Sequence, residues 1–408
     1  MKILHTSDWH LGRTLYGRKR YEEFAAFLHW LTVTLAQEQV DVLLVAGDVF
    51  DTHMPSHRAQ ELYYQFLGRV TAVCRHVVLI AGNHDSPSLL NAPKDLLRAL
   101  HVHVIGAASD KRADEVVVLD QPDGAPELIV CAVPYLRDRD IRVTAAGESV
   151  EDKEQKLLDG IRNHYAEVVA LAEQKRQAIN PATPIIAMGH LFTTGGQTVD
   201  GDGVRALYVG SMAHVAVGLL PTALDYLALG HLHVPQKVQG SEVMRYSGSP
   251  LPMGFGEARQ PKSVCLVEQT EHGMAVRLLP VPVFQALESI RGTWPTLQAR
   301  LAALVAARSQ AWLEIVYEGD EVIGDLRERL AAAVAGSALE ILRIQDKRII
   351  NQALSQLYEA EQLSDLEVHE VFDRCLTAHQ VPEAQRPALC HAYQEILTTL
   401  HETDSQAE

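Results

Sequence analysis

Residues 40–51 read VDVLLVAGDVFD and decide the fold of this chain. A nearly continuous apolar run, here from Val40 to Ala46, is typical of a strand that is buried on both faces of a sheet. Gly47 permits a tight turn after this strand, and the carboxylate of Asp48 follows at once. The stretch therefore predicts a layered α/β fold in which a charged residue lies at the end of a buried strand.

The same alternation of elements continues on both sides of this strand. Residues 2–6 and 76–81 read as strands, and residues 20–38 and 57–73 read as helices with apolar residues near helical spacing. Residues 151–178 read as a long polar helix on the surface. Further strands are expected at 127–133, 184–188, 225–229, 243–247 and 262–268.

Five short motifs follow predicted strands and contain residue types that bind metal ions or move protons. They are Asp8-Trp9-His10, Gly47-Asp48-Val49-Phe50-Asp51, Gly82-Asn83-His84-Asp85, Gly189-His190 and Gly230-His231-Leu232-His233. Sites in such sheets form outside the carboxyl ends of the strands, so we expect the motifs to meet. Each motif alone could be an ordinary turn or a surface histidine. Five such motifs in this order, all at the ends of predicted strands, are hard to explain in that way.

The residue types fit a two-metal site for phosphoester hydrolysis. Two divalent ions about 3.5–4 Å apart neutralise the phosphate and lower the pKa of a bound water from ~15.7 towards ~7. Such a site needs one carboxylate that both ions share, and Asp48 is the best candidate. The other candidate ligands combine oxygen and imidazole donors: Asp8, His10, Asn83, His190, His231 and His233.

Three residues beside these ligands have other expected roles. His84 is set apart as a proton donor or transition-state stabiliser. Asp85 is expected to orient the His84 ring, as carboxylates commonly orient imidazoles. Asp51 is expected to hold ligand geometry from outside the metal site. The mixed ligands suit Mn²⁺, Fe²⁺ or Zn²⁺, and the order of metal affinities alone does not decide among them.

The net charge of −16 argues against a general nucleic-acid-binding surface. The charge is uneven, because residues 350–408 carry 11 Asp and Glu against 2 Lys and Arg, a net of −9. Residues 1–20 are locally basic. Four cations after the first motif are candidate DNA contacts, with a solvated loop and helix start as the alternative: Arg13, Arg18, Lys19 and Arg20.

The length of 408 residues predicts two or three domains. Residues 279–283, LPVPV, read as a linker, which gives a first domain at 1–280. Residues 281–345 read as a small α/β unit, and residues 346–408 as acidic helices with an apolar face. The elements expected in the small unit are helices at 294–308 and 320–335 and strands at 312–317 and 339–344.

Cysteine usage and hydropathy indicate a cytoplasmic protein. The 5 cysteines are scattered without a CxxC pair, which is typical of reduced thiols. Nothing at the N-terminus reads as a signal peptide. No apolar run approaches the ~18 residues that a membrane span needs.

The five motifs resemble those of the calcineurin-like metallophosphoesterase superfamily. Within it, four longer stretches resemble the bacterial SbcD nucleases: HTSDWHLG at 5–12, AGNHDS at 81–86, LGHLH at 229–233 and YSGSP at 246–250. The resemblance covers the whole chain. It implies a layered metallophosphoesterase β-sandwich flanked by helices, a small α/β capping domain that helps hold DNA, and C-terminal helices.

The resemblance also implies an activity. It implies a manganese-dependent nuclease that cuts double-stranded ends as a 3′–5′ exonuclease and opens hairpins and single strands as an endonuclease, in DNA repair, recombination and replication. One ion would be held by Asp8, His10 and His233, the other by Asn83, His190 and His231, with Asp48 between them. His84 falls on the catalytic histidine of the family.

The partner implied by the resemblance is SbcC, an ATPase with long coiled coils. The nuclease would form a homodimer within a heterotetramer, associated with the nucleoid in the cytoplasm. Residues 346–408 would dock on SbcC. Their charge supports this, because a −9 segment repels phosphates and amphipathic helices favour a protein groove. The alternative is that these helices pack on their own domain.

Two other functions share the candidate ligands. A phosphatase or phosphodiesterase of a small substrate would use the same metal chemistry, but it has little use for the second α/β unit and the acidic helices. A non-catalytic scaffold would tolerate the loss of ligands or of His84, and all of them are present.

Overall fold

The computed structural model describes residues 1–141, 150–193, 196, 223–319, 321 and 323–346, with scattered positions between 372 and 393. The chain divides into two compact units, Met1–Glu288 and the residues from Ser289 onward. Most of the acidic segment 346–408, for which helices are predicted, lies outside the described residues.

The first sheet of the larger unit contains the stretch that decides the fold. Its strand order is β14-β13-β1-β4-β5-β6, and β1, β4, β5 and β6 run parallel. β13 pairs antiparallel with β1 and brings Glu268 opposite Lys2. The strands are β1 Lys2–Thr6, β4 Val42–Ala46, β5 His76–Ile80, β6 Val102–Ile105, β13 Ser263–Thr270 and β14 Gly273–Pro280.

The second sheet has the order β11-β12-β10-β9-β8-β7. Its central strands β8, β9, β10 and β12 run parallel, so their carboxyl ends lie at one edge. The strands are β7 Val116–Asp120, β8 Pro126–Ala132, β9 Ile185–His190, β10 Tyr226–Gly230, β11 Gln236–Lys237 and β12 Met244–Tyr246.

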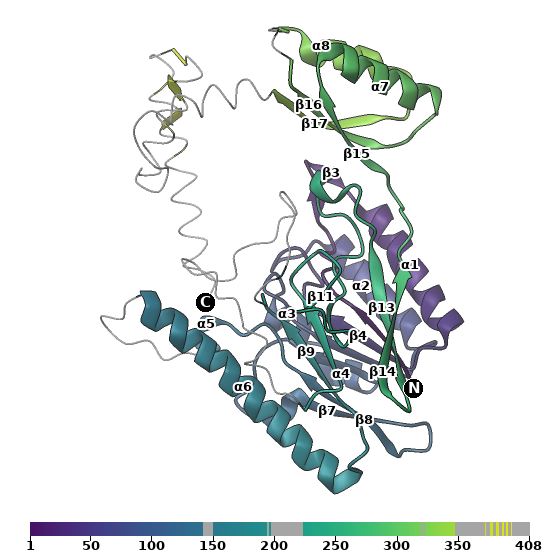
Figure 1. The fold of residues 1–408 in the computed structure, drawn as a ribbon, viewed down its shortest axis with the longest axis vertical. Helices are drawn as coiled ribbons and strands as arrows, with labels where there is room; N and C mark the ends of the chain where they lie inside the picture. The colour runs from purple at the N-terminus through teal and green to yellow at the C-terminus, as the bar shows by residue number, and fades with distance from the viewer. Residues whose placement is uncertain are drawn as a thin grey trace. The chain divides into compact units, whose positions relative to one another are not determined.

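The two sheets pack face to face, with helices on both outer faces. Side chains such as Val42 and Val78 of the first sheet share a buried cluster with Val130 and Ile186 of the second. The helices α1, Tyr21–Glu38, and α2, His57–Val70, cover the first sheet, and α6, Val150–Ile179, covers the second (Figure 1). The layered sandwich predicted from the sequence is therefore confirmed.

The long helix α6 is an integral layer of this sandwich. The sequence predicts its extent and its exposed polar face well, but it does not predict the face that packs against the second sheet. Leu157, Ile161, Tyr165, Val168 and Ala172 are buried against the second sheet. Their spacing of three to four residues forms one apolar stripe. Because the other face carries many charges, the average polarity of the segment is high and does not indicate this stripe.

The smaller unit is a three-stranded sheet with two helices, in the strand order β15-β16-β17. Its elements are β15 Leu287–Gly292, α7 Trp294–Ala306, β16 Trp312–Tyr317, α8 Leu326–Val334 and β17 Glu340–Asp346. The linker predicted at 279–283 is wrong for its first half. Leu279 and Val281 are buried in the larger unit, and the Val281 N–H donates to the Lys262 carbonyl at 2.9 Å.

Short elements complete the larger unit. They are β2 Thr14–Leu15, β3 Arg18–Lys19, α3 Pro87–Asn91, α4 Lys94–Arg98, α5 Asp138–Ile141 and the 3-10 helices η1 Arg112–Glu115 and η3 Phe255–Glu257. The hairpin β2–β3 directly follows the first motif, so it places the basic residues of positions 13–20.

Candidate metal centre

The five motifs meet where strands of both sheets end. The loops after β1 and β4 are joined because the Asp8 N–H donates to the Gly47 carbonyl at 3.0 Å and the His10 N–H to the Asp48 carbonyl at 2.9 Å. The loop after β10 joins them, since the His231 N–H donates to Asp8 Oδ1 at 2.9 Å. The expectation that the motifs converge is confirmed.

Four of the candidate ligands have left-handed backbone conformations. Their φ angles are 54° at Asp8, 49° at His10, 51° at Asp48 and 103° at His231. Non-glycine residues seldom adopt positive φ, and such strain persists where the surrounding structure enforces it, commonly at functional sites. The strained backbone therefore supports a functional role for these turns.

Two glycines allow the loops to approach each other. A Cβ atom on Gly82 would lie 2.2 Å from Asp48 Oδ1, and one on Gly230 would lie 1.9 Å from the Ala46 carbonyl oxygen. Neither position leaves room for a side chain, because the Cβ would also lie 2.4 Å from the Asp48 backbone nitrogen at Gly82 and meets backbone directly at Gly230. Gly82 is thus required for the loops after β4 and β5 to meet within the first sheet, and Gly230 for the end of β10 to approach β4 across the two sheets.

The first group that could hold a metal ion contains Asp8, His10 and His233, all buried. His10 Nε2 lies 3.1 Å from His233 Nε2. The other nitrogen of His10, Nδ1, lies 3.3 Å from Asp51 Oδ1, which is the contact expected of Asp51. A proton on Nδ1, the nitrogen that faces Asp51, would leave a lone pair on His10 Nε2, so a cation near both rings suits this arrangement.

The second group contains Asp48, His190 and His231. His190 Nδ1 donates to the Ala46 carbonyl at 3.0 Å. Its Nε2 then faces two oxygen acceptors, Asn83 Oδ1 at 3.0 Å and Asp48 Oδ2 at 3.3 Å. Because acceptors do not stabilise one another without a proton or a cation between them, this geometry fits a metal site.

A buried histidine nitrogen supports the same conclusion. His231 Nε2 is buried and has no hydrogen-bond partner among the described residues. Buried polar atoms are normally satisfied, and an exception calls for an ion, a water or a function. Because its ring lies in the second group beside Asp48 and His190, this nitrogen fits the donor set of a divalent ion.

The electrostatics of the centre also call for positive charge. Burial lowers the pKa of His190, but the Asp48 carboxylate outweighs it and raises the pKa to about 9. Burial would raise the pKa of Asp48, but the nearby His190 charge holds that pKa well below its usual range. Burial raises the pKa of Asp8. Two buried carboxylates therefore depend on a cation, which a proton on His190 or a metal ion can supply.

His84 lies at the edge of both groups. Its backbone N–H donates to Asp48 Oδ1 at 2.9 Å, and its ring Nδ1 donates to the Asp51 carbonyl at 2.8 Å. The ring packs edge-on against His10, with 4.8 Å between the ring centroids. Since Nδ1 is bound to a backbone carbonyl, Nε2 is the atom that can exchange a proton within the centre.

The prediction that Asp85 orients His84 is wrong. The Asp85 carboxylate is fully buried and accepts hydrogen bonds from the backbone N–H groups of Gly82, Val49 and Phe50 at 2.8, 3.1 and 2.9 Å. Burial raises its pKa to about 7. Asp85 therefore ties the loop after β5 to the loop after β4 and does not contact the reacting groups.

The four candidate DNA contacts divide into different environments. The prediction for Arg20 is wrong, because this side chain is 1% exposed, pairs with Glu23 at 2.7 Å and donates to the Pro252 carbonyl at 2.8 Å. Arg13 is largely covered and contacts Asp51 at 3.2 Å. Arg18 and Lys19 are exposed on β3.

The predictions from the sequence missed two charged residues behind His233. Glu257 and Lys262 are buried and form an ion pair. Both contact Ser249, which belongs to the YSGSP stretch at 246–250. The YSGSP stretch is the sequence feature that could have pointed to this region. Its position in the sequence does not reveal that Ser249 contacts Glu257 and Lys262.

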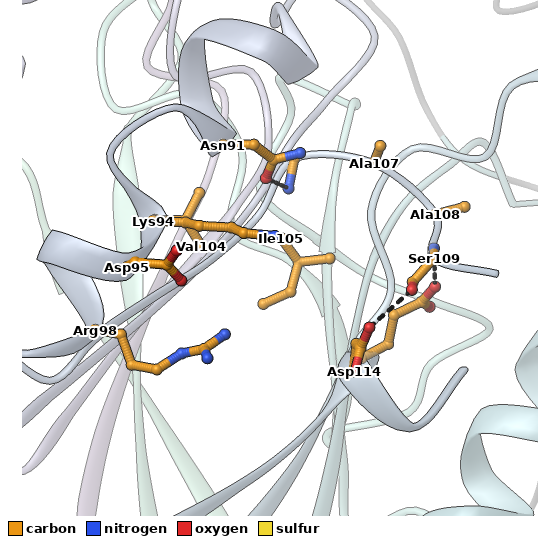
Figure 2. A pocket seen from close by; sticks show the side chains of 12 residues that line it. Asn91, Lys94, Asp95, Arg98, Val104, Ile105, Ala107, Ala108, Ser109 and Asp114 are labelled. Carbon is orange, nitrogen blue, oxygen red and sulfur yellow. Dashed lines mark hydrogen bonds between the residues drawn. The ribbon is translucent and has the colours of Figure 1, made fainter. Parts of the chain in front are cut away.

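A separate pocket of about 340 Å³ lies between α4 and the loop at 106–109. Figure 2 shows Asn91 bonded to the loop at Gly106, and Ser109 bonded to Asp114. No candidate metal ligand lines this pocket. Lys94 and Asp95 give it both signs of charge, so its lining indicates no particular ligand.

Within the part of the chain that the structure describes, no helix is long and apolar enough to cross a membrane.

Comparison with known proteins identifies relatives along the whole chain. Residues 1–235 match the calcineurin-like phosphoesterases, and residues 283–380 match the Type 5 capsule protein repressor C-terminal domain. The SbcD subunit of nuclease SbcCD from Escherichia coli K12 is 37% identical over 404 residues, which cover 98% of each chain. The proteins of the same name from Rhodobacter capsulatus and Bacillus subtilis are 42% and 37% identical over 69% and 66% of each chain.

Proposed function

Because the chain belongs to the calcineurin-like phosphoesterases and, among them, to the SbcD subunits of nuclease SbcCD, we propose that it is a two-metal DNA nuclease. Its substrates are double-strand ends, which it degrades as a 3′–5′ exonuclease, and hairpins and single strands, which it cuts internally. The observation that carries this proposal is the buried centre in which histidine nitrogens and carboxylate oxygens face one another.

In this proposal Asp48 is the carboxylate shared by two ions. One of its oxygens, Oδ2, lies 3.5 Å from His10 Nε2 in the first group and 3.3 Å from His190 Nε2 in the second. A single oxygen between both groups is the placement that a bridging ligand needs. Asp8, His10 and His233 would hold one ion, and Asn83, His190 and His231 would hold the other.

The bound ions supply charge neutralisation of the phosphate and an activated water. The chain itself supplies the proton chemistry at the leaving group. His84 Nε2 donates a proton to the departing oxygen, while the Asp51 carbonyl fixes the ring through Nδ1. Manganese is the proposed metal, since mixed carboxylate, amide and imidazole ligands suit it and the resemblance implies it.

The remaining parts of the proposal concern partners. The smaller unit, from Ser289 to residue 345, is the capping domain that helps hold DNA, and residues 346–408 dock on the SbcC ATPase. The net charge of −9 between residues 350 and 408 supports a protein partner over DNA for the last segment. Two copies of the chain join SbcC in a heterotetramer.

A cleavage assay on a hairpin-ended duplex tests the proposal. We expect cleavage with Mn²⁺ that is abolished by a chelator, and faster cleavage when SbcC is added. A chain that ends at residue 345 should retain cleavage but lose the effect of SbcC. No Mn²⁺-dependent cleavage by the full chain, with or without SbcC, would show that the proposed function is wrong.

The two exposed cations of β3 are the revised candidates for DNA contact. We expect the double variant Arg18→Ala/Lys19→Ala to bind duplex DNA more weakly and to reduce the slope of log affinity against log salt by about 1 for each phosphate that is no longer neutralised. The control is Arg69→Ala/Arg162→Ala, which removes the same charge from helices α2 and α6. Equal salt slopes for both variants would contradict the assignment.

A further inference from the structure

A buried ion pair lies on the side of His233 that faces away from His10. Glu257 ends the 3-10 helix η3 and is 0% exposed, and Lys262 is 5% exposed. The Lys262 ammonium contacts Glu257 Oε2 directly. A buried ion pair seldom stabilises a fold more than apolar residues of the same size would, so this pair invites a functional explanation.

Lys262 fixes the backbone of His233. Its ammonium donates to the His233 carbonyl at 3.0 Å, to Ser249 Oγ at 3.0 Å and to Gln260 Oε1 at 2.9 Å. The Ser249 N–H donates to the same His233 carbonyl at 3.1 Å. The carbonyl of this candidate ligand therefore accepts two hydrogen bonds, from Lys262 and from Ser249, which lie 29 and 16 positions later in the sequence.

Glu257 faces the ring of His233. Its Oε2 is satisfied by Lys262 and by the Met253 N–H at 3.2 Å. Its Oε1 is buried, has no hydrogen-bond partner among the described residues, and lies 3.7 Å from His233 Nδ1. A shift of several tenths of an ångström brings this pair within ordinary hydrogen-bond distance, which would also satisfy the carboxylate oxygen.

The arrangement repeats one already seen at His10. Asp51 lies 3.3 Å from His10 Nδ1, and the Nε2 atoms of His10 and His233 face each other at 3.1 Å. His190 differs, since a neutral backbone carbonyl accepts from its Nδ1. A carboxylate behind an imidazole fixes its tautomer and makes it a more basic ligand than a carbonyl does.

We propose that Glu257 is a positioning residue that fixes His233 with Nε2 directed at the ion shared with Asp8 and His10, and that Lys262 holds Glu257 in place. This inference rests on the proposed metal centre. It has a measurable consequence: the ion held by Asp8, His10 and His233, both of whose histidines have a carboxylate behind them, binds more tightly than the ion beside His190.

Titration of the metal-free protein with Mn²⁺ tests the proposal, with free Mn²⁺ followed by electron paramagnetic resonance. We expect the wild type to bind two ions. Glu257→Gln should weaken one of them by about 10- to 100-fold, as is usual when such a carboxylate is removed, and leave the other unchanged. Because this variant removes the carboxylate charge that faces Lys262, Glu257→Gln/Lys262→Met, which removes both charges of the pair, should show the same reduction in affinity.

Glu115→Gln is the matched control. Glu115 of η1 and His164 of α6 form another buried carboxylate–histidine pair, 2.6 Å apart, so its removal should leave both Mn²⁺ affinities unchanged. Glu257→Asp keeps the charge beside Lys262 but draws the carboxylate away from His233, and it serves if the neutral variants do not fold. Here we expect an intermediate reduction in affinity.

Unchanged binding of both ions in the double variant, or in Glu257→Asp where the double variant does not fold, would overturn the role of Glu257. A wild type that binds no Mn²⁺ would overturn the metal centre and this inference together. A wild type that binds two ions but does not cut DNA would overturn the nuclease proposal alone, and the comparison of affinities would still decide the role of Glu257.

Discussion

Replacing His84 with glutamine is expected to lower the rate of DNA cleavage by about 10²- to 10⁴-fold, the contribution usual for a positioned general acid or base. Mn²⁺ binding should be retained, because in the proposed centre His84 is not one of the residues that hold the ions and its Nδ1 is bound to the Asp51 carbonyl. The backbone N–H that donates to Asp48 Oδ1 at 2.9 Å is unaffected by the substitution. The variant should therefore be folded and metal-loaded, but slow.

Single-turnover cleavage at saturating Mn²⁺ measures this effect on the chemical step. His29→Gln, at an exposed position of α1, removes one imidazole elsewhere and should cleave like the wild type. If His84→Gln cleaves at the wild-type rate, His84 does not transfer the proton. If it loses Mn²⁺ instead, its position within 4.8 Å of Asp48 and His10 ligand atoms marks a ligand and not an acid.

The convergence of the motifs could be predicted because it depends on local sequence. The run from Val42 to Ala46 is apolar at every position, and all of it is buried in β4. Parallel strands bring their carboxyl ends to one edge, so Asp48 had to lie near residues that follow neighbouring strands. The glycines at 82 and 230 likewise mark places where two backbones approach closely.

The errors concern contacts between distant parts of the chain or with the backbone. Arg20 is buried because its guanidinium reaches the carbonyl of Pro252, 232 positions later. The ring of His84 is oriented by the main-chain carbonyl of Asp51. Every residue has such a carbonyl, so the sequence does not indicate which one binds the ring, and the neighbouring Asp85 carboxylate was predicted instead. Glu257 escaped prediction for the same reason, since only the fold places it behind His233.

Replacing Asp48 with asparagine should weaken the binding of both ions. Substitutions at the other ligands should weaken the binding of one ion only. Oδ2 of Asp48 lies between His10 and His190, one from each group, so the removal of its charge affects the whole centre. Replacing a residue that only supports a metal ligand lowers metal affinity by up to roughly 100-fold. Because Asp48 is itself a proposed ligand, the reduction in affinity should be larger. The neutral amide can still accept the His84 N–H, so the fold should persist.

Comparison with Asp8→Asn separates a shared ligand from an ordinary one. Asp8 lies in the first group alone, so its substitution should weaken the binding of one ion and leave the affinity for the other unchanged. Added Mn²⁺ should raise the melting temperature of the wild type, because a ligand that binds the folded state stabilises it, and should barely change that of Asp48→Asn. If Asp48→Asn loses only one ion, the carboxylate is not shared. Neutralising a carboxylate that binds both ions must weaken the binding of both.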